Sequence, residues 1–346
     1  MIINNGKIAR MPLSRTLIAG ASVGLLALAG CSSASDDDGA ASDNPDASLV
    51  VGASFYPLQF VAERVGGDDV DVTSLISAGV EPHDAEMSPA TVRSMQNMDT
   101  VLYLADFSAA VDDAIETTGV RSLDAHHIVD EHEGDVVAHA EADHDHESGE
   151  AHEDDEDHDH ADEESDEDAH DDHDHGAADP HFWQDPTLVA EFADDVVAEF
   201  SELDPDNAAD YEARGEELKA ELNDLDAAYA EGLAVCERRD IFVSHEAYGY
   251  LSARYDLHQE GLSGLDPEAE PSPARVREIR DLIEGTGATT LFTESLVSAA
   301  VAESLASDVG VTTAVLDPIE SVTEGDDYLG VMERNLEALR TGLACD

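Results

Sequence analysis

Basic side chains are scarce in this chain. Its 346 residues include 81 Asp and Glu but only 16 Lys and Arg, and Lys occurs only at positions 7 and 219. An acidic surface repels phosphate backbones, which excludes nucleic-acid binding. The acidity is global, because only 24 of the 81 acids lie in the most acidic stretch, residues 130–174. Molar salt shortens the Debye length to about 3 Å and screens such self-repulsion, so we expect a halophilic protein.

Cysteine is also rare, with three residues. Cys31 follows a short basic segment and an apolar run. The apolar run is shorter than the roughly 20 residues that a membrane-spanning helix needs. A basic segment followed by such a run is typical of a secretory signal. The letters LAGC resemble a lipobox. We therefore predict a lipoprotein signal peptide over residues 1–30, a lipidated Cys31 that anchors the exported protein to the outer face of the cell membrane, and a flexible tether over residues 31–48. The alternative is an ordinary cleaved signal followed by an incidental cysteine.

The other two cysteines, Cys236 and Cys345, would lie in an oxidising setting if the chain is exported. A disulfide between them is the expected arrangement in that setting. Two separate buried thiols are the alternative. A bond between them would close a long loop and constrain the unfolded chain.

Short apolar runs alternate with helical patterns in two parts of the chain, residues 49–125 and 236–346. Alternation of this kind predicts an α/β lobe with a parallel sheet in each part. Residues 126–178 contain 12 of the 16 histidines and lack apolar periodicity, so we expect a disordered loop rich in His, Asp and Glu. Residues 179–235 are helical in pattern, with a break at LDPDN, and should form a rigid connector.

Four histidines lie outside the predicted loop: His83, His181, His245 and His258. All but His258 follow a strand or precede a helix, and ligands of open α/β sheets bind beyond the carboxyl ends of strands. Each alone is more often a hydrogen-bonded surface residue, but three in such positions point to a shared site. Three neutral imidazoles suit zinc and leave one tetrahedral position for a carboxylate or water. Glu294, at the end of another strand, is the candidate fourth ligand.

Four segments carry a family resemblance. PHDAEMSP, DPHFWQDP, SHEAYGYL and LFTESLVS, the last followed by VLDPI, resemble in the same order the motifs of the solute-binding proteins of zinc and manganese ABC importers. The resemblance covers residues 49–345. It implies two similar α/β lobes with mainly parallel sheets, joined by a long rigid helix, and a metal site in the interlobe cleft. It also implies that His83, His181 and His245 are ligands.

The function implied by this resemblance is capture of extracellular Zn²⁺ with high affinity and its delivery to an ABC permease with a cytoplasmic ATPase; we expect a monomer. In the pattern that manganese-type members of this family resemble, acids stand at the positions of His245 and Ser298. This chain therefore has a site richer in nitrogen, and nitrogen ligands favour zinc over manganese. A manganese or iron receptor of the same family is the alternative. Three roles stay open at the fourth position: Glu294 coordinates the metal, Glu294 orients a ligand, or water binds.

The predicted loop offers many weak, interchangeable chelates. We interpret it as a low-affinity collector of zinc, and a solvated acidic linker is the alternative. Its candidate histidines are His139, His144, His146, His152, His158, His160, His170, His173 and His175.

Two other classes of protein compete with a transport receptor. A zinc hydrolase would use the same histidines with Glu294 or Glu246 as general base. Gly249, however, stands where the second His of H-E-x-x-H would lie, and G-x-S-x-G is absent from the sequence. We therefore predict that the chain is not an enzyme. The third hypothesis is an extracellular zinc buffer or adhesin.

Overall fold

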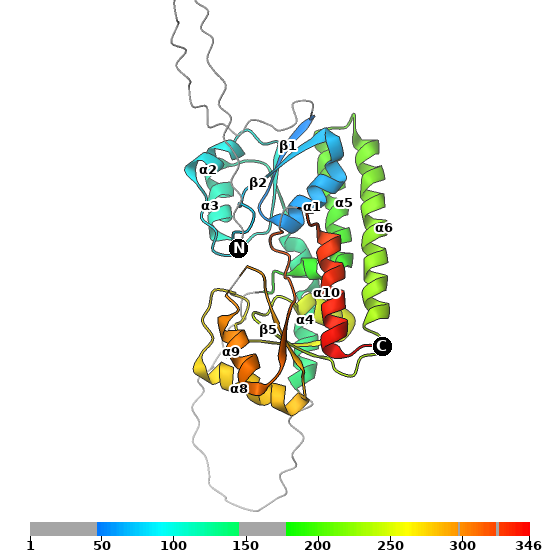
Figure 1. Cartoon of the computed structure of the whole chain (residues 1–346). Helices are drawn as coiled ribbons and strands as arrows, with labels where there is room; N and C mark the ends of the chain where they lie inside the picture. Colours follow the sequence, from blue (N-terminus) through cyan, green and yellow to red (C-terminus); the bar gives the residue numbers. More distant parts are fainter. Residues whose placement is uncertain (1–46, 145–177, 297, 323–324) are drawn as a thin grey trace, which may run out of the picture. The chain divides into compact units, whose positions relative to one another are not determined.

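The computed structural model describes residues 47–144, 178–296, 298–322 and 325–346 (Figure 1). The predicted signal peptide, Cys31 and the predicted histidines from His146 to His175 lie outside these residues. Among the helices that the structure describes, none is long and apolar enough to cross a membrane.

The first lobe is built on a four-stranded parallel sheet in the order β2-β1-β3-β4. Its strands are short and mostly buried, as fits a parallel sheet covered by helices. The elements are β1 (Leu49–Ala53), α1 (Tyr56–Gly66), the 3₁₀ turn η1 (Gly67–Asp69), β2 (Val70–Ser74), α2 (Pro89–Met95), β3 (Thr100–Tyr103), α3 (Ala109–Thr118) and β4 (Ser122–Asp124). The Ser88 side chain caps α2 at its start, and Gly119 ends α3 with a left-handed φ of 61°, a conformation that glycine adopts readily.

The second lobe repeats this plan with the order β6-β5-β7-β8, again parallel. Each strand is followed by a helix, and the two predicted α/β lobes with parallel sheets are confirmed. The elements are β5 (Asp240–Val243), α7 (Gly249–Tyr255), β6 (His258–Gly261), α8 (Pro273–Thr286), β7 (Thr290–Thr293), α9 (Ala300–Val309), β8 (Thr312–Val315) and α10 (Tyr328–Leu343).

The connector consists of a short turn, η2 (Phe182–Gln184), and two packed helices, α5 (Pro186–Leu203) and α6 (Ala208–Gly232), separated at the predicted break. Helix α6 contacts both lobes. Arg214 Nε donates to the Val65 carbonyl of the first lobe at 2.7 Å, and the Tyr229 hydroxyl donates to the Met332 carbonyl of α10, also at 2.7 Å. The long helix therefore fixes both lobes to one rigid support.

The structure differs from our expectation of a disordered loop at its beginning, because residues 126–144 form helix α4 (His126–His144). Ile128 and Val129 are fully buried in the main core, and Val136 packs against the same core. His139, expected to collect metal, lies on this helix, with Nε2 2.6 Å from the Leu257 carbonyl of the second lobe. Ile128, Val129 and Val136, seven or eight residues apart, are the apolar signal of this buried helical face, whereas Val137 is 47 % exposed.

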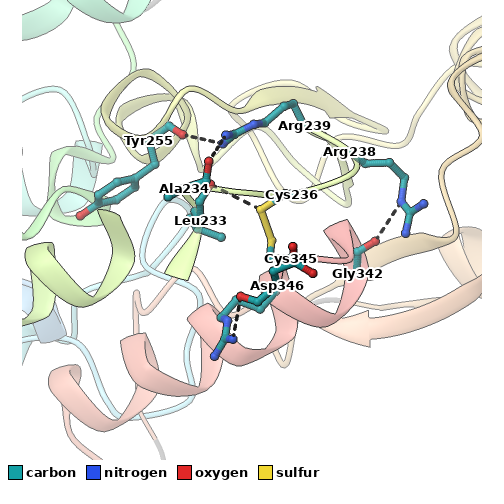
Figure 2. The surroundings of a disulfide bond; sticks show 10 residues. Leu233, Ala234, Cys236, Arg238, Arg239, Tyr255, Gly342, Cys345 and Asp346 are labelled. Atoms are coloured by element: carbon teal, nitrogen blue, oxygen red, sulfur yellow. Dashed lines mark hydrogen bonds between the residues drawn. A yellow bond between two sulfur atoms is a disulfide. The ribbon is translucent and has the colours of Figure 1, made fainter. Parts of the chain in front are cut away.

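The predicted disulfide between Cys236 and Cys345 is present (Figure 2), and its two cysteines are 109 positions apart in the sequence. Cys236 lies just after α6 and Cys345 just after α10, so the bond ties together the ends of two helices. Nearby, Arg238 Nε donates to the Gly342 carbonyl at 3.4 Å, and the Asp346 amide donates to the Val235 carbonyl at 3.0 Å. The C-terminus is therefore fastened to the start of the second lobe.

Candidate metal centre

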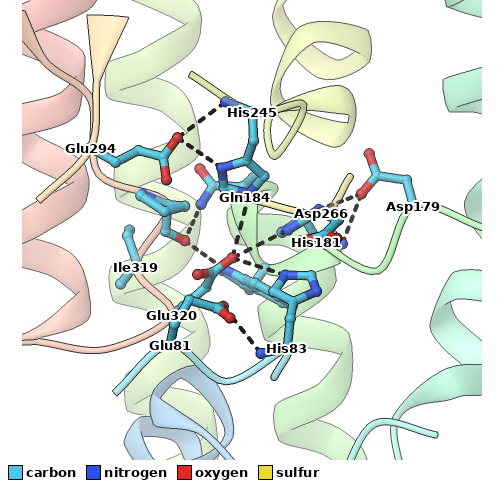
Figure 3. A network of polar contacts seen from close by, with 12 residues as sticks. Glu81, His83, Asp179, His181, Gln184, His245, Asp266, Glu294, Ile319 and Glu320 are labelled. Atoms are coloured by element: carbon cyan, nitrogen blue, oxygen red, sulfur yellow. Dashed lines mark hydrogen bonds and ion pairs between the residues drawn. The ribbon is translucent and has the colours of Figure 1, made fainter. Parts of the chain in front are cut away.

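Four side chains converge between the two lobes, and their potential ligand atoms all lie within 4.8 Å of one another (Figure 3). His83 lies on the loop after β2, His181 directly before η2, His245 directly after β5, and Glu320 on the segment after β8. The carboxyl ends of parallel strands thus meet at this point, as expected for an α/β ligand site.

Glu320 is at the centre of the cluster. Its Oε1 lies 3.3 Å from Nε2 of His83, 3.3 Å from Nε2 of His181 and 3.7 Å from Nε2 of His245. Its side chain is 2 % exposed. Burial alone would raise the pKa of this carboxyl, but contacts with the three imidazoles, foremost His181, hold the pKa well below its usual range. The carboxylate is therefore ionised and faces three nitrogens.

Two of the imidazoles are held by carboxylates in the same way. Asp179 Oδ1 accepts from both the backbone amide and Nδ1 of His181, at 2.9 and 2.8 Å. Glu294 Oε1 accepts from the amide and Nδ1 of His245, at 3.2 and 2.7 Å. These contacts fix the tautomer and leave Nε2 to face the cluster. Gly249 leaves room for Asp179, because a Cβ at this glycine would collide with Asp179 Oδ2.

The electrostatics of the two held imidazoles follow from these contacts. Burial alone would lower the pKa of His245, but Glu294 and Glu320 raise it to about 10. The pKa of His181 is also raised against the effect of burial, by Asp179 and Glu320. Nε2 of each ring is buried and makes no hydrogen bond within the described residues. A buried nitrogen that lacks a hydrogen-bond partner fits a position that a metal ion fills.

His83 is held differently. The Glu81 carboxylate accepts from the amides of His83 and Asp84, at 3.1 and 3.3 Å, which shapes the turn that carries the imidazole. The ring packs edge-on against Phe107, with centroids 4.4 Å apart. The His83 side chain is 14 % exposed, against 0 % for His181. His83 is thus the most accessible of the four groups.

The backbone before Glu320 is fixed by contacts from the distant connector. Trp183 Nε1 and Gln184 Nε2 both donate to the Pro318 carbonyl, at 2.7 and 2.6 Å. Ile319 adopts a left-handed φ of 64°, which is unfavourable for a β-branched residue. Such a conformation persists only where the surroundings impose it, so the position of Glu320 is strongly specified.

The structure brings the three predicted histidines together but does not place Glu294 among the ligand atoms. Glu294 instead holds His245, which corresponds to the orienting role left open by the sequence. Glu320 is not among the ligands that the sequence predicts, although it directly follows the VLDPI segment. Of the other acids considered, Glu246 Oε1 lies 3.5 Å from Arg275 Nη2. His258 Nδ1 lies 3.5 Å from Asp240, outside the metal centre.

A second group of potential ligand atoms lies on the α4–α5 surface, formed by Glu131, His132 and Glu191. His132 Nε2 lies 3.4 Å from Glu191 Oε2, and both side chains are partly exposed. This group is more exposed than the interlobe centre and contains a single imidazole.

Sequence and structure comparisons agree on the relatives of the chain. Residues 51–342 match the family described as zinc-uptake complex component A, periplasmic. The chain is 32 % identical to the zinc-binding lipoprotein AdcA of Streptococcus pneumoniae over 309 residues, which cover 85 % of this chain and 56 % of AdcA. It thus spans about half the length of the first curated relatives it matches. It is also 30 % identical to the high-affinity zinc uptake system protein ZnuA of Bacillus subtilis, over 92 % of this chain and 94 % of that protein.

Among solved structures, the Zn(II)-bound ZnuA-like domain of S. pneumoniae AdcA is similar, with a TM-score of 0.64 and 29 % identity over 85 % of this chain and 98 % of that domain. The laminin-binding protein Lmb of Streptococcus agalactiae, described as having adhesin and metal-transporting activity, gives a TM-score of 0.67 and 25 % identity, over 85 % of this chain and 99 % of Lmb.

Proposed function

The chain belongs to the family of periplasmic zinc-uptake complex component A, and from this premise we propose that it is the receptor that captures extracellular Zn²⁺ for import. One observation carries the proposal. Three imidazole Nε2 atoms and one carboxylate face a common point, with the ligand atoms within 4.8 Å of one another. Zinc is the cargo of this site.

The chemistry of the donor set favours zinc over manganese. Zinc takes four ligands in a tetrahedron and accepts both imidazole nitrogen and carboxylate oxygen. Manganese is harder and prefers oxygen-rich sites with more ligands. His83, His181 and His245 supply three nitrogens, and we assign Glu320 as the fourth ligand. Glu294 and Asp179 then act as the groups that orient His245 and His181.

A receptor fits this centre better than a hydrolase. A catalytic zinc keeps one position open for water, whereas four protein ligands close the tetrahedron. Glu294, the general base of the hydrolase hypothesis, is 3 % exposed at its side chain and is engaged with His245. In this assignment all four side chains bind the ion, and no described carboxylate stands as a general base beside an open coordination position.

Metal analysis tests the assignment. The variant should lack residues 145–175, which leaves α4 intact, and should be purified in molar salt. We expect one Zn²⁺ per chain, retained against excess Mn²⁺. His181→Ala should remove this tight site, and His258→Ala is the matched control because His258 lies outside the centre. Retention of manganese in preference to zinc, or tight zinc in His181→Ala, contradicts the proposal.

The delivery partner and the anchor are part of the same proposal. The family takes part in zinc uptake, which supports an ABC permease with its ATPase as the recipient of the ion and a lipid-anchored monomer as the donor. AdcA, a relative, is named a lipoprotein. Cys31→Ser should release the protein from the membrane into the medium, and membrane retention of this variant contradicts anchoring through Cys31.

The His-rich segment is proposed as a low-affinity collector of zinc. Of its nine candidate histidines, His139 and His144 lie on helix α4, and His139 Nε2 is 2.6 Å from the Leu257 carbonyl. The full chain should bind several weak zinc ions beyond the tight one, and the variant without residues 145–175 should lose them. A variant that keeps the segment's acids but replaces its histidines with Asn separates imidazole binding from the bulk negative charge.

A further inference from the structure

Among the described residues, the metal centre is most accessible to solvent on the side of His83. The side chains of His181, His245 and Glu320 are 0 %, 1 % and 2 % exposed, whereas that of His83 is 14 % exposed. A cavity of about 460 Å³ lies on the His83 side. A second cavity, of about 290 Å³, touches Glu320, but the burial of that carboxylate closes this side. An ion that enters the centre therefore passes His83.

The cavity beside His83 has a lining suited to a cation. Asp106 of the first lobe and Asp266 of the second lobe are exposed carboxylates that line it, and neither Lys nor Arg is among its described lining residues. Carboxylates of one sign at a low-dielectric wall raise the local concentration of cations. The volume far exceeds the space that one water needs, so an ion can enter with its waters.

His126, at the start of α4, also lines the cavity, and hydrogen bonds fix the orientation of its ring. Its Nδ1 lies 3.1 Å from the Ala105 carbonyl, which can only accept, so Nδ1 carries the proton. Its amide donates to Asp124 Oδ1 at 2.9 Å, which fixes the start of the helix. Nε2 of the ring lies 3.4 Å from Asp130 Oδ1, so an imidazole nitrogen and a carboxylate oxygen stand next to each other, one helical turn apart on α4.

We propose that this cavity is the vestibule through which zinc reaches the centre, and that His126, which lines the cavity, forms a transient binding station with the neighbouring Asp130 of α4. This inference rests on the proposed function. Two ligands leave most of the coordination shell to water, which makes binding weak and exchange fast, whereas the four converging groups retain the ion. From the station the ion passes to His83, which borders the same cavity.

The chain contains a reporter for the test. Trp183 is its only tryptophan, is fully buried, and its ring centroid lies 5.1 Å from that of His181. Stopped-flow tryptophan fluorescence of the full chain in molar salt, with free Zn²⁺ as probe, follows arrival at the centre. We expect His126→Asn to lower the association rate constant at least about threefold and the dissociation rate constant equally, since steering changes rates more than affinity.

His127→Asn is the matched control, because this neighbouring imidazole contacts Asp195 at 3.0 Å on the α5 side and does not line the cavity. Asp130→Asn, at a residue whose side chain is 71 % exposed, should slow association without a risk to folding. Association rates of His126→Asn and Asp130→Asn equal to that of His127→Asn overturn the station. A change in the equilibrium constant with an unchanged association rate also overturns it. Absence of tight zinc binding in the unmodified chain overturns the proposed function instead.

Discussion

The two lobes share one strand order but contribute unequally to the metal centre. The second lobe supplies His245 and Glu320, and Glu294 holds His245 from a third strand end. The first lobe supplies only His83, on a loop and with the most exposed side chain of the four. The second lobe and the connector therefore present a prepared half-site, and the first lobe completes it. We expect zinc to draw the first lobe onto the second, with the amplitude limited by α6.

The largest effect should come from the disulfide that fastens the second lobe. Replacing both Cys236 and Cys345 with Ser should lower the free energy of unfolding by about 2–5 kcal/mol, because the bond closes a long loop in the unfolded chain. Urea denaturation followed by circular dichroism measures this.

The zinc affinity of this double variant should stay within about twofold of the unmodified chain, because the bond joins helix ends and not the strand ends that carry ligands. A large loss of zinc affinity would show that the geometry of the half-site in the second lobe depends on the disulfide between the ends of α6 and α10.

Glu320→Gln should have the next largest effect. It removes the only carboxylate ligand and leaves three imidazoles around an uncharged amide, so zinc affinity should fall by more than about 100-fold, beyond the usual loss from an orienting partner. Competition titration against a zinc chelator measures the affinity.

Glu294→Gln is the matched comparison for Glu320→Gln. The amide oxygen can still accept from His245 Nδ1 but carries no charge, so the loss should be about 10- to 100-fold. A larger loss in Glu294→Gln than in Glu320→Gln would return the ligand role to Glu294.

The lobes also differ in how much of the site the sequence predicts. His83, His181 and His245 were identified because each lies in a quoted motif at a strand end or helix start, and strand alternation predicted where these ends meet. Glu320 was missed because its position depends on contacts across 134 and 135 residues, from Gln184 and Trp183 to Pro318. No local pattern encodes such contacts.

Helix α4 illustrates the same limit. Its sequence is dominated by charge and His, which favours disorder, and of its described side chains Ile128, Val129 and Val136 are packed against the hydrophobic core. Burial against α7 stabilises a helix that its own composition does not predict. The position of His126 beside the vestibule follows from this packing, so the sequence alone does not reveal it.

His83→Ala should cost less than Glu320→Gln. A water from the vestibule can replace this most exposed imidazole, and three protein ligands with one water form a stable zinc geometry. Affinity should therefore fall about 10- to 100-fold. His245→Ala is the comparison, and its loss should be greater because the buried Glu294 carboxylate then lacks its imidazole partner. Equal losses of zinc affinity in the two variants would indicate that the ligands of both lobes are held equally well in position before zinc binds.

Ser321→Ala should give the smallest effect and tests the contact between the lobes directly. Ser321 Oγ accepts from the Gly79 amide at 2.7 Å, which joins the loop that carries His83 to the segment that carries Glu320. A hydrogen bond of this kind contributes about 0.5–1.5 kcal/mol, so zinc affinity should fall by about two- to tenfold. Faster amide hydrogen exchange in residues 76–86 of the zinc-bound variant would locate the loss in the first lobe. Faster exchange in β5 or β7 instead would show that the second lobe is not the prepared half.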